Sequence, residues 1–440
     1  MEIAELSKIL RENGIVGAGG AGFPTYGKLS EKADTILMNC AECEPLLKVH
    51  QQLLQEHPQE IMKAFALVAS TVGAKDAIIG IKKEYKSTIA ALKEYIGDFP
   101  GMRIHELPGA YPMGDEVVLI YETTGRQVRP GGLPIECGVA VFNVETLYNV
   151  YRAAFLNLPV TEKYVTVVGE VENPITVRVP IGITVSEVVA MAGNVTTEDP
   201  VYLLGGPMMG NFGTSNQPLT KTSNAIIVLP KDHPLVLKKQ GKFSIDVSRA
   251  ASICCQCQTC TDLCPRHNLG HPIRPHLFMR AAANRDFHDL DPFLDTFFCC
   301  SCGVCEMYAC PQGLAPRSMI AEYKNGLRKQ GVRAPKRTAV PVKESREYRK
   351  VPEERLMGRL GVSQYNVKAP LDDHLRTCSH VKLMLSQHIG APAKAAVQVG
   401  DTVKAGQVIG AAADGLSVNI HASIDGKITE VTDRYVVIGQ

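Results

Sequence analysis

The sequence predicts a multidomain protein of mixed α/β and α+β class. Its 440 residues are enough for two to four domains. Helical and strand patterns alternate in the first third, and β-branched strand runs follow. Ten of the 14 cysteines fall between Cys254 and Cys310. We expect a first domain at 1–158, a middle domain at 159–240, a cysteine-rich domain at 241–330, a linker at 331–366 and a tail domain at 367–440.

The first domain is expected to be a layered α/β unit, because helices and short strands alternate along it. The expected elements are a helix at 1–13, a glycine-rich loop at 14–28, a strand at 35–38, helical stretches at 46–72 and 83–97, strands at 77–81 and 103–106, and a helix at 144–157. Gly14 is the expected stop of the first helix.

The middle and tail domains are expected to be mainly β. The runs TVVGEV, ITVRVP and AIIVLP in the middle domain are β-branched strands, interrupted by a short helix near 186–192. In the tail domain, VGDTVKAGQVIG and HASIDGKITEV are short strands with Gly and Asp turns. Between 331 and 355 stand eight Lys/Arg and four Asp/Glu, which predicts a solvated linker, with a basic docking patch as the alternative.

The charge and hydropathy of the chain exclude several classes of protein. Lys and Arg number 47 and Asp and Glu 45, and this near balance argues against a nucleic-acid-binding protein. No run of 18 apolar residues predicts a membrane span. The start, MEIAELSK, lacks the apolar core of a secretory signal. We therefore expect a cytoplasmic protein, in which clustered thiols are metal ligands rather than disulfides.

The cysteine-rich domain carries two copies of an iron–sulfur ligand motif. The first, Cys254-x2-Cys257-x2-Cys260-x3-Cys264 before a proline, matches the bacterial ferredoxin run. The second begins 45 residues later and comprises Cys299, Cys302, Cys305 and Cys310, with four residues rather than three before its last cysteine. Three thiolates at this spacing can bind three irons on one face of a cubane cluster. Because the motif occurs twice, the sequence predicts two [4Fe–4S] clusters.

In two-cluster ferredoxins the last cysteine of each motif binds the other cluster. One cluster is therefore expected to use Cys254, Cys257, Cys260 and Cys310, and the other Cys299, Cys302, Cys305 and Cys264. Zinc and redox-active thiols are the alternatives, although a zinc ribbon needs no third cysteine at this spacing. Cys255 and Cys300 each adjoin a ligand and are expected to be free thiols that point away from the clusters.

The glycine-rich loop has the form of a dinucleotide fingerprint, Gly17-x-Gly19-x-x-Gly22, but a helix precedes it and Phe23-Pro24 follows. Glycines let the backbone approach a phosphate or a flat ring, and Lys28 supplies positive charge. A turn that serves only the backbone path is the alternative.

Four segments together carry a family resemblance. GAGGAGFPTYGK at 17–28, NCAECEP at 39–45, AYPMGDE at 110–116 and NVET at 143–146 resemble the flavin subunit of respiratory complex I. They are still more similar to the C subunit of Rnf electron-transport complexes. In those proteins the small barrel-sandwich domain comes first, whereas here the comparable segment is last. That order resembles the cobalamin reductases of propanediol-utilisation microcompartments, and the resemblance covers nearly the whole chain.

The resemblance implies a set of residues that bind FMN and NADH. The glycine loop, including Gly17, Gly19, Gly20 and Gly22, would hold the FMN with Lys28. The isoalloxazine and nicotinamide side would be lined by Asn39, Glu42 and Glu44. The other wall would be closed by Tyr111, Gly114, Asp115 and Glu116. Asn143 and Thr146 would lie near the flavin phosphate at a helix start, and Phe23 would stack on NADH. Surface carboxylates at Glu42 and Glu44, and simple packing at Tyr111 and Phe23, are the alternatives.

The same resemblance implies the remaining domains and the activity. The middle domain would be an SLBB-like β-grasp and the tail a barrel-sandwich domain without an attachment lysine. NADH would reduce FMN, and two [4Fe–4S] clusters would pass single electrons to a corrinoid. Expected partners are a corrinoid or a corrinoid adenosyltransferase and microcompartment shell proteins, with the protein inside or at the shell. An Rnf-type electron-transfer protein with another acceptor and a non-enzymatic adaptor are the alternatives.

Overall fold

The computed structural model describes residues 1–440. In the first domain, four strands form a parallel sheet in the order β3-β2-β1-β5. Their bounds are β1 (Thr35–Cys40), β2 (Asp76–Lys82), β3 (Met102–Leu107) and β5 (Val139–Asn143). The expected strands are confirmed, and β5 joins them beside β1. Because the strands are parallel, the loops that follow β1 and β5 leave the same edge of the sheet.

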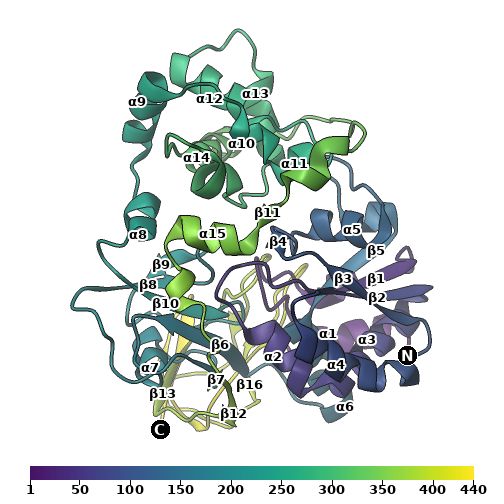
Figure 1. Cartoon of the computed structure of the whole chain (residues 1–440). Coiled ribbons are helices and arrows are strands. Elements are labelled where there is room, and N and C mark those ends of the chain that lie inside the picture. The colour runs from purple at the N-terminus through teal and green to yellow at the C-terminus, as the bar shows by residue number, and fades with distance from the viewer.

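Helices cover both faces of this sheet (Figure 1). They are α1 (Ile3–Glu12), α2 (Val49–Glu56), α3 (Pro58–Val72), α4 (Lys86–Tyr95), α5 (Glu116–Thr124) and α6 (Val144–Leu156). Ile36 and Met38 of β1 belong to the core with α1 to α4 and α6, whereas Leu37 belongs to the core with α5. This alternation is the period of two of a strand buried on both faces. The expected single helical stretch at 46–72 is two helices, because Pro58 starts a new one.

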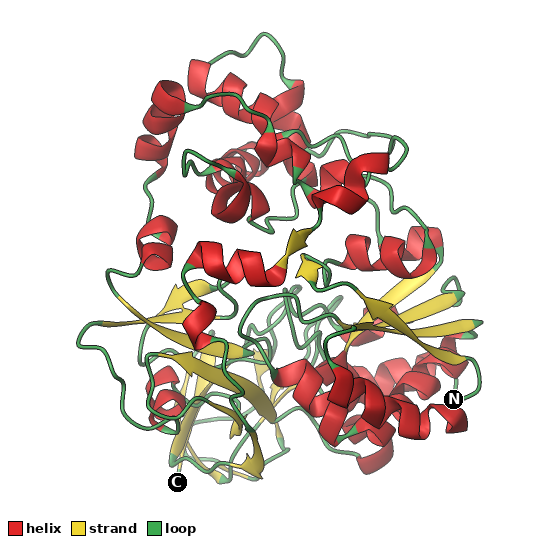
Figure 2. Cartoon of the chain, in the orientation of Figure 1, coloured by secondary structure: helices red, strands yellow, loops and turns green.

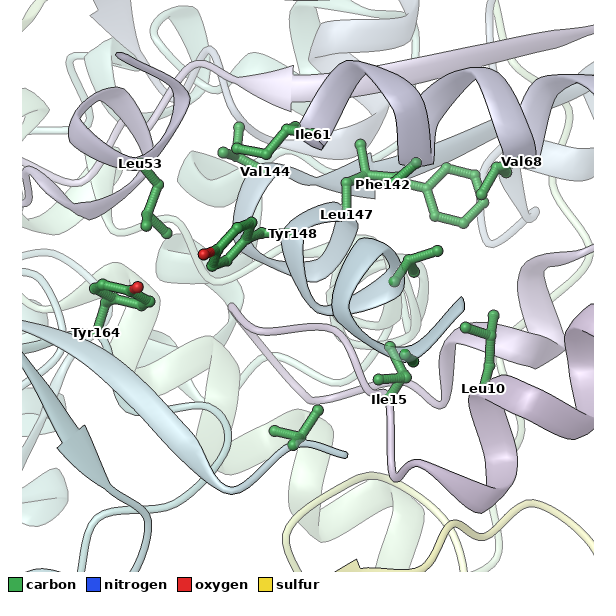
Figure 3. Close-up of a cluster of buried hydrophobic side chains, with 14 of the residues drawn as sticks. Leu10, Ile15, Leu53, Ile61, Val68, Phe142, Val144, Leu147, Tyr148 and Tyr164 are labelled. Atoms are coloured by element: carbon green, nitrogen blue, oxygen red, sulfur yellow. The ribbon is translucent and has the colours of Figure 1, made fainter. Parts of the chain in front are cut away.

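The largest core joins the first domain to the middle and tail domains. Figure 3 shows part of it: Leu10 and Ile15 from the N-terminus lie near Leu147 of α6, and Tyr148 lies near Tyr164 of the middle domain. Tyr148 and Tyr164 meet edge to face with ring centroids 6.3 Å apart. The same core contains aliphatic side chains of the tail domain, so the two ends of the chain are packed together.

The middle domain is built on a six-stranded sheet in the order β12-β7-β6-β10-β8-β9. Its elements are β6 (Glu162–Gly169), β7 (Ile175–Pro180), α7 (Val185–Ala190), β8 (Pro200–Leu204), β9 (Asn211–Gly213) and β10 (Ala225–Pro230). The edge strand β12 (Leu371–Leu375) comes from the expected tail segment and pairs with β7. The three expected strand runs and the short helix are confirmed.

The cysteine-rich domain is helical and lies at one end of the molecule, at the top of Figures 1 and 2. Its helices are α9 (Phe243–Ile253), α10 (Thr259–Asp262), α11 (Pro265–Asn268), α12 (Pro275–Asn284), α13 (Asp291–Leu294) and α14 (Pro316–Lys329). The preceding helix α8 (Pro234–Lys239) packs Leu235 and Val236 into the core that contains Leu203 of the middle domain. A π-helical turn spans Val304–Ala309. Phe278, Phe293 and Tyr323 pack their rings together in the core of this domain.

The expectation of a solvated linker at 331–366 is wrong for its second half. Residues 331–343 are mostly exposed. Beyond them, β11 (Val351–Pro352) pairs antiparallel with β4 (Ala110–Tyr111) of the first domain. The next helix, α15 (Glu353–Leu360), buries Leu356, Met357 and Leu360. Leu360 follows Met357 by three residues and Leu356 by four, which is the spacing of one helix face. The charged residues around them hide this pattern in the sequence.

The tail domain has two small antiparallel sheets, β13-β19-β18-β15 and β14-β16-β17. The strands are β13 (His380–Met384), β14 (Lys394–Ala395), β15 (Thr402–Val403), β16 (Val408–Ala411), β17 (Ile420–His421), β18 (Gly426–Val431) and β19 (Tyr435–Gly439). The tail domain contacts the glycine-rich loop, because the hydroxyl of Tyr26 donates to the carbonyl of Ser417. The amine of Lys221 in the middle domain donates to the carbonyls of both Gly14 and Asn419. No helix of the chain is long and apolar enough to cross a membrane.

Candidate functional site: a flavin cleft and two groups of cysteines

The glycine-rich loop closes back on itself beside the carboxyl end of the sheet. Val16 pairs with Pro24, and the amide of Gly17 donates to the carbonyl of Phe23 at 2.9 Å. Gly20 has φ +74°, a conformation that favours glycine. The amide of Ala18 donates to the hydroxyl of Thr146 at 2.9 Å, which ties the loop to the first turn of α6.

A cleft of about 170 Å³ opens between this loop and the ends of β1 and β5. Its lining residues are Gly20, Asn39, Glu42, Cys43, Glu44, Leu47, His50, Gly114, Asn143 and Asn224. Six of the predicted flavin-site residues are among them, and all four of the family-like segments contribute. The structure therefore brings these distant segments together around one hollow.

Two asparagines in the cleft are held by the backbone. Asn39 donates to the carbonyl of Gly114 at 2.9 Å and accepts from the amide of Ala41 at 3.1 Å. Asn143 caps α6 by accepting from the amides of Glu145 and Thr146 at 3.0 and 3.3 Å. Both side chains are thus fixed in place before any ligand arrives, and the N-terminus of α6 faces the glycine loop.

The two carboxylates of the cleft have different partners. Glu42 is buried and accepts from the amides of His50 and Gln51, at the start of α2, so the alternative of a surface carboxylate is wrong for it. Glu44 accepts from the amides of Met208 and Met209 of the middle domain, both at 2.9 Å. Burial raises the pKa of Glu44 to about 7, although these amides and the nearby Lys239 oppose the shift.

A second hollow of about 520 Å³ contains three other predicted residues, Phe23, Lys28 and Glu116. The amine of Lys28 donates to the carbonyl of Val141 at 2.8 Å and lies 3.5 Å from Glu116. Phe23 is 37% exposed. Val141 of the second hollow is two residues before Asn143 of the cleft, and Glu116 is two residues after Gly114. The two hollows are therefore neighbours that share the end of β5 and the turn at 114–116.

Tyr111 and Asp115 face the cysteine-rich domain instead of the cleft. The buried hydroxyl of Tyr111 donates to the carbonyl oxygen of Cys302 at 2.7 Å. One oxygen of Asp115 caps α5, and the other pairs with Arg266 at 2.8 Å. The prediction that these two side chains close the flavin wall does not match their contacts. The backbone of this turn does reach the cleft, through Gly114.

One group of thiols surrounds a cavity at the surface of the cysteine-rich domain. Cys254, Cys257 and Cys260 of the first motif line it together with Cys310 of the second. Cys310 of the second motif therefore lies with the cysteines of the first, which is compatible with the crossed assignment. Cys255 is exposed and also borders the cavity, so it does not point wholly away.

The other group lies deeper. Burial raises the pKa of the Cys264 and Cys305 thiols, and Cys264 and Cys299 pack against the same hydrophobic core. Cys302 and Cys305 are each 8% exposed. No three of these side chains are arranged about a single metal ion. In a [4Fe–4S] cluster the four thiolates instead bind four different irons and lie farther apart. Four thiols drawn from both motifs would provide these ligands. Cys300 is packed beside Cys302 and Arg266.

Sequence reasoning missed several residues of the site. Asn224 and His50 line the cleft, and Arg266 joins the two domains, but none of the three belongs to a recognisable motif. Lys82 is buried, donates to the carbonyl of Glu42 and pairs with Glu353 of α15. A lysine at the end of a hydrophobic strand is the only signal that could have indicated Lys82.

Four family models match the chain. They are the Nuo51 FMN-binding domain at residues 10–152, the SLBB domain at 164–212, the 4Fe-4S dicluster domain at 253–315 and the RnfC barrel sandwich hybrid domain at 366–440. The predicted kinds of domain and cofactor are thereby confirmed.

The chain is similar to known proteins over different lengths. It is 41% identical to "Cobalamin reductase PduS" of Salmonella typhimurium, over 99% of this chain and 96% of that protein. It is 32% identical to the C subunit of the Na(+)-translocating ferredoxin:NAD(+) oxidoreductase complex of Acetobacterium woodii, over 61% of this chain and 59% of that protein. A crystal structure of an NAD+-reducing [NiFe]-hydrogenase in the air-oxidized state shares the fold, with a TM-score of 0.50, 20% identity and coverage of 84% and 67% of the two chains.

Proposed function

This chain belongs to the cobalamin reductase family of PduS, and on that premise we propose that it carries electrons from NADH through FMN and two [4Fe–4S] clusters to a corrinoid. The observation that supports the proposal best is the contact between the second cysteine motif and a domain of the FMN-binding type, through the Tyr111 hydroxyl and the Cys302 carbonyl. The overall reaction would be NADH plus two cob(III)alamin giving NAD+, one proton and two cob(II)alamin.

Bound flavin would supply the conversion between the two-electron chemistry of a nicotinamide and the one-electron chemistry of a cluster. The residues suited to hold it are those of the cleft. A methyl group placed on Gly114 would come within 3.1 Å of Cys43 Sγ, closer than ordinary van der Waals contact. The glycine at this position therefore keeps this side of the cleft open for a flat ring. The first turn of α6 and the amine of Lys28 supply positive charge that would attract the phosphate of the flavin.

The expected ligand sets are supported by the two thiol groups. Cys310 lines a cavity with the first motif, and Cys264 packs against the same hydrophobic core as Cys299 of the second motif. We therefore keep the crossed assignment, with Cys254, Cys257, Cys260 and Cys310 for one cluster and Cys264, Cys299, Cys302 and Cys305 for the other.

We further propose that the protein works with a corrinoid adenosyltransferase and with shell proteins of a bacterial microcompartment. This part rests on sequence similarity to PduS proteins. Co-purification of the tagged chain with shell proteins, compared with a strain that lacks the shell genes, would test it. A diffuse distribution of the labelled chain in cells with intact shells would contradict it.

The reaction itself is tested anaerobically with protein reconstituted with FMN, iron and sulfide. We expect NADH to bleach the flavin and then to convert cob(III)alamin to cob(II)alamin at two per NADH. If the flavin bleaches and electrons pass to ferredoxin but never to a corrinoid, the Rnf-type function replaces this one. If no flavin binds, the protein is not this enzyme.

A further inference from the structure

We propose that the two clusters act in a fixed order. The cluster of Cys264, Cys299, Cys302 and Cys305, here the inner cluster, would receive each electron from the flavin. The cluster of Cys254, Cys257, Cys260 and Cys310, here the outer cluster, would deliver it to the acceptor. The inference rests on the proposed function for its cofactors, but the order comes from contacts of this chain.

The first argument is the contact between the flavin cleft and the inner group. Cys43 lines the cleft and packs against the hydrophobic core that contains Tyr111 and Cys302. The Tyr111 hydroxyl bonds the carbonyl of Cys302 at 2.7 Å, and three residues later the Gly114 carbonyl bonds Asn39 inside the cleft. The short segment 111–114 therefore separates the cleft from the second-motif loop.

The second argument is that several further contacts hold the inner group close to the flavin cleft. Arg266, two residues after Cys264, pairs with Asp115 at 2.8 Å. A methyl group on Gly303 would lie 3.4 Å from the end of Met208, whose amide holds Glu44 of the cleft. An ion pair, a hydrogen bond and apolar packing thus hold the inner group against the first and middle domains.

The third argument is the exposure of the outer group. Of the proposed ligands, Cys257 of the outer group is exposed, whereas Cys302 and Cys305 of the inner group are buried. The cavity of the outer group opens among the uncharged side chains of Gln256, Gln258 and Gln312, so an acceptor can approach it from solvent. The outer group also adjoins the inner one, because α10, which carries Cys260, packs against the Val304–Ala309 turn.

The electron balance requires two passes for each NADH. One electron would reduce the inner cluster, and its transfer to the outer cluster would reoxidise the inner one. The outer cluster would then give that electron to one acceptor. A second pass would return the flavin to its oxidised form, and the proton derived from the transferred hydride would leave to solvent.

Selective loss of each cluster tests the order without relying on turnover. In Cys305→Ser, we expect NADH to bleach the flavin while the remaining cluster stays EPR-silent on the timescale of seconds and is reduced only by dithionite. In Cys257→Ser, the inner cluster should still be reduced by NADH as fast as in the parent. Rapid reduction of the outer cluster in Cys305→Ser would overturn the order.

A measurement on the unaltered protein covers the case in which these variants lose both clusters. A water-soluble paramagnetic chelate should enhance the electron-spin relaxation of the outer cluster severalfold more than that of the inner cluster. Equal enhancement, or the reverse, would overturn the assignment of the outer cluster as the exit. Failure of NADH to bleach the flavin in the parent would instead reject the proposed function, so the two failures are distinguishable.

Discussion

The hydroxyl of Tyr111 in the first domain donates a hydrogen bond of 2.7 Å to the carbonyl oxygen of Cys302 in the second cysteine motif. The two residues are 191 positions apart and both are buried. This bond lies where the proposed path from flavin to cluster crosses between domains. A buried carbonyl left without its donor costs about 1–3 kcal/mol, so the bond contributes to the fit of the two domains.

Tyr111→Phe keeps the ring and removes only this hydrogen bond. We expect flavin reduction by NADH to be unchanged and flavin reoxidation by the inner cluster to slow severalfold, measured by anaerobic stopped-flow absorbance. Tyr348→Phe, at a residue that is 90% exposed, is the matched control and should behave like the parent. An unchanged reoxidation rate in Tyr111→Phe would show that the contact does not position the cluster.

Cys264→Ser tests the crossing of ligands between motifs. Because the last cysteine of each motif is assigned to the other cluster, and Cys264 packs against the same core as Cys299, we expect this change to alter the EPR signal of the inner cluster and leave that of the outer cluster. Cys310→Ser should do the opposite. Cys255→Ser is the control and should retain both clusters by iron content. Loss of the outer signal in Cys264→Ser would mean that each motif binds its own cluster.

Lys28→Ala should weaken FMN binding. A charge-assisted hydrogen bond to a phosphate contributes about 1.5–3 kcal/mol, so the dissociation constant should rise about 10- to 100-fold. Fluorescence titration of the apoprotein with FMN measures the change. Lys8→Ala, with a lysine on the exposed face of α1, is the control.

The denatured parent should release FMN and not FAD, and finding FAD would contradict the assignment of the site.

Glu44 predicts a pH dependence of stability. Its pKa is raised from 4.5 to about 7, so between these values the folded protein holds a proton that the unfolded chain has lost. Stability from this group therefore falls as the pH rises through that window. In Glu44→Gln the fall is absent. The Tm of the variant minus that of the parent should thus increase from pH 5 to pH 8, measured by thermal melts. A difference that stays flat over this range would show that the carboxyl is already ionised at pH 5.

Much of the fold follows from local patterns. Strand runs such as 35–38 and 77–81 are short and strongly apolar, and the cysteine spacing indicates clusters because few other sites need it. The helix break before Pro58 is consistent with proline chemistry, but the good helix formers Gln, Glu and Leu around it favour a single helix. The segment 344–365 is predicted wrongly, because its many charges outweigh the spacing of Leu356 and Leu360.

The sequence by itself determined which chemistry the protein carries: eight cysteines in two motifs and a glycine loop with its companion segments. Only the tertiary structure decided which of these residues meet. It placed Asn39, Gly114 and Asn143 in one cleft and directed Tyr111 and Asp115 toward the cysteine-rich domain. The physical reason is that motifs follow the ligand preferences of single residues, whereas these contacts arise from the parallel sheet and from domains packed across nearly two hundred residues of chain.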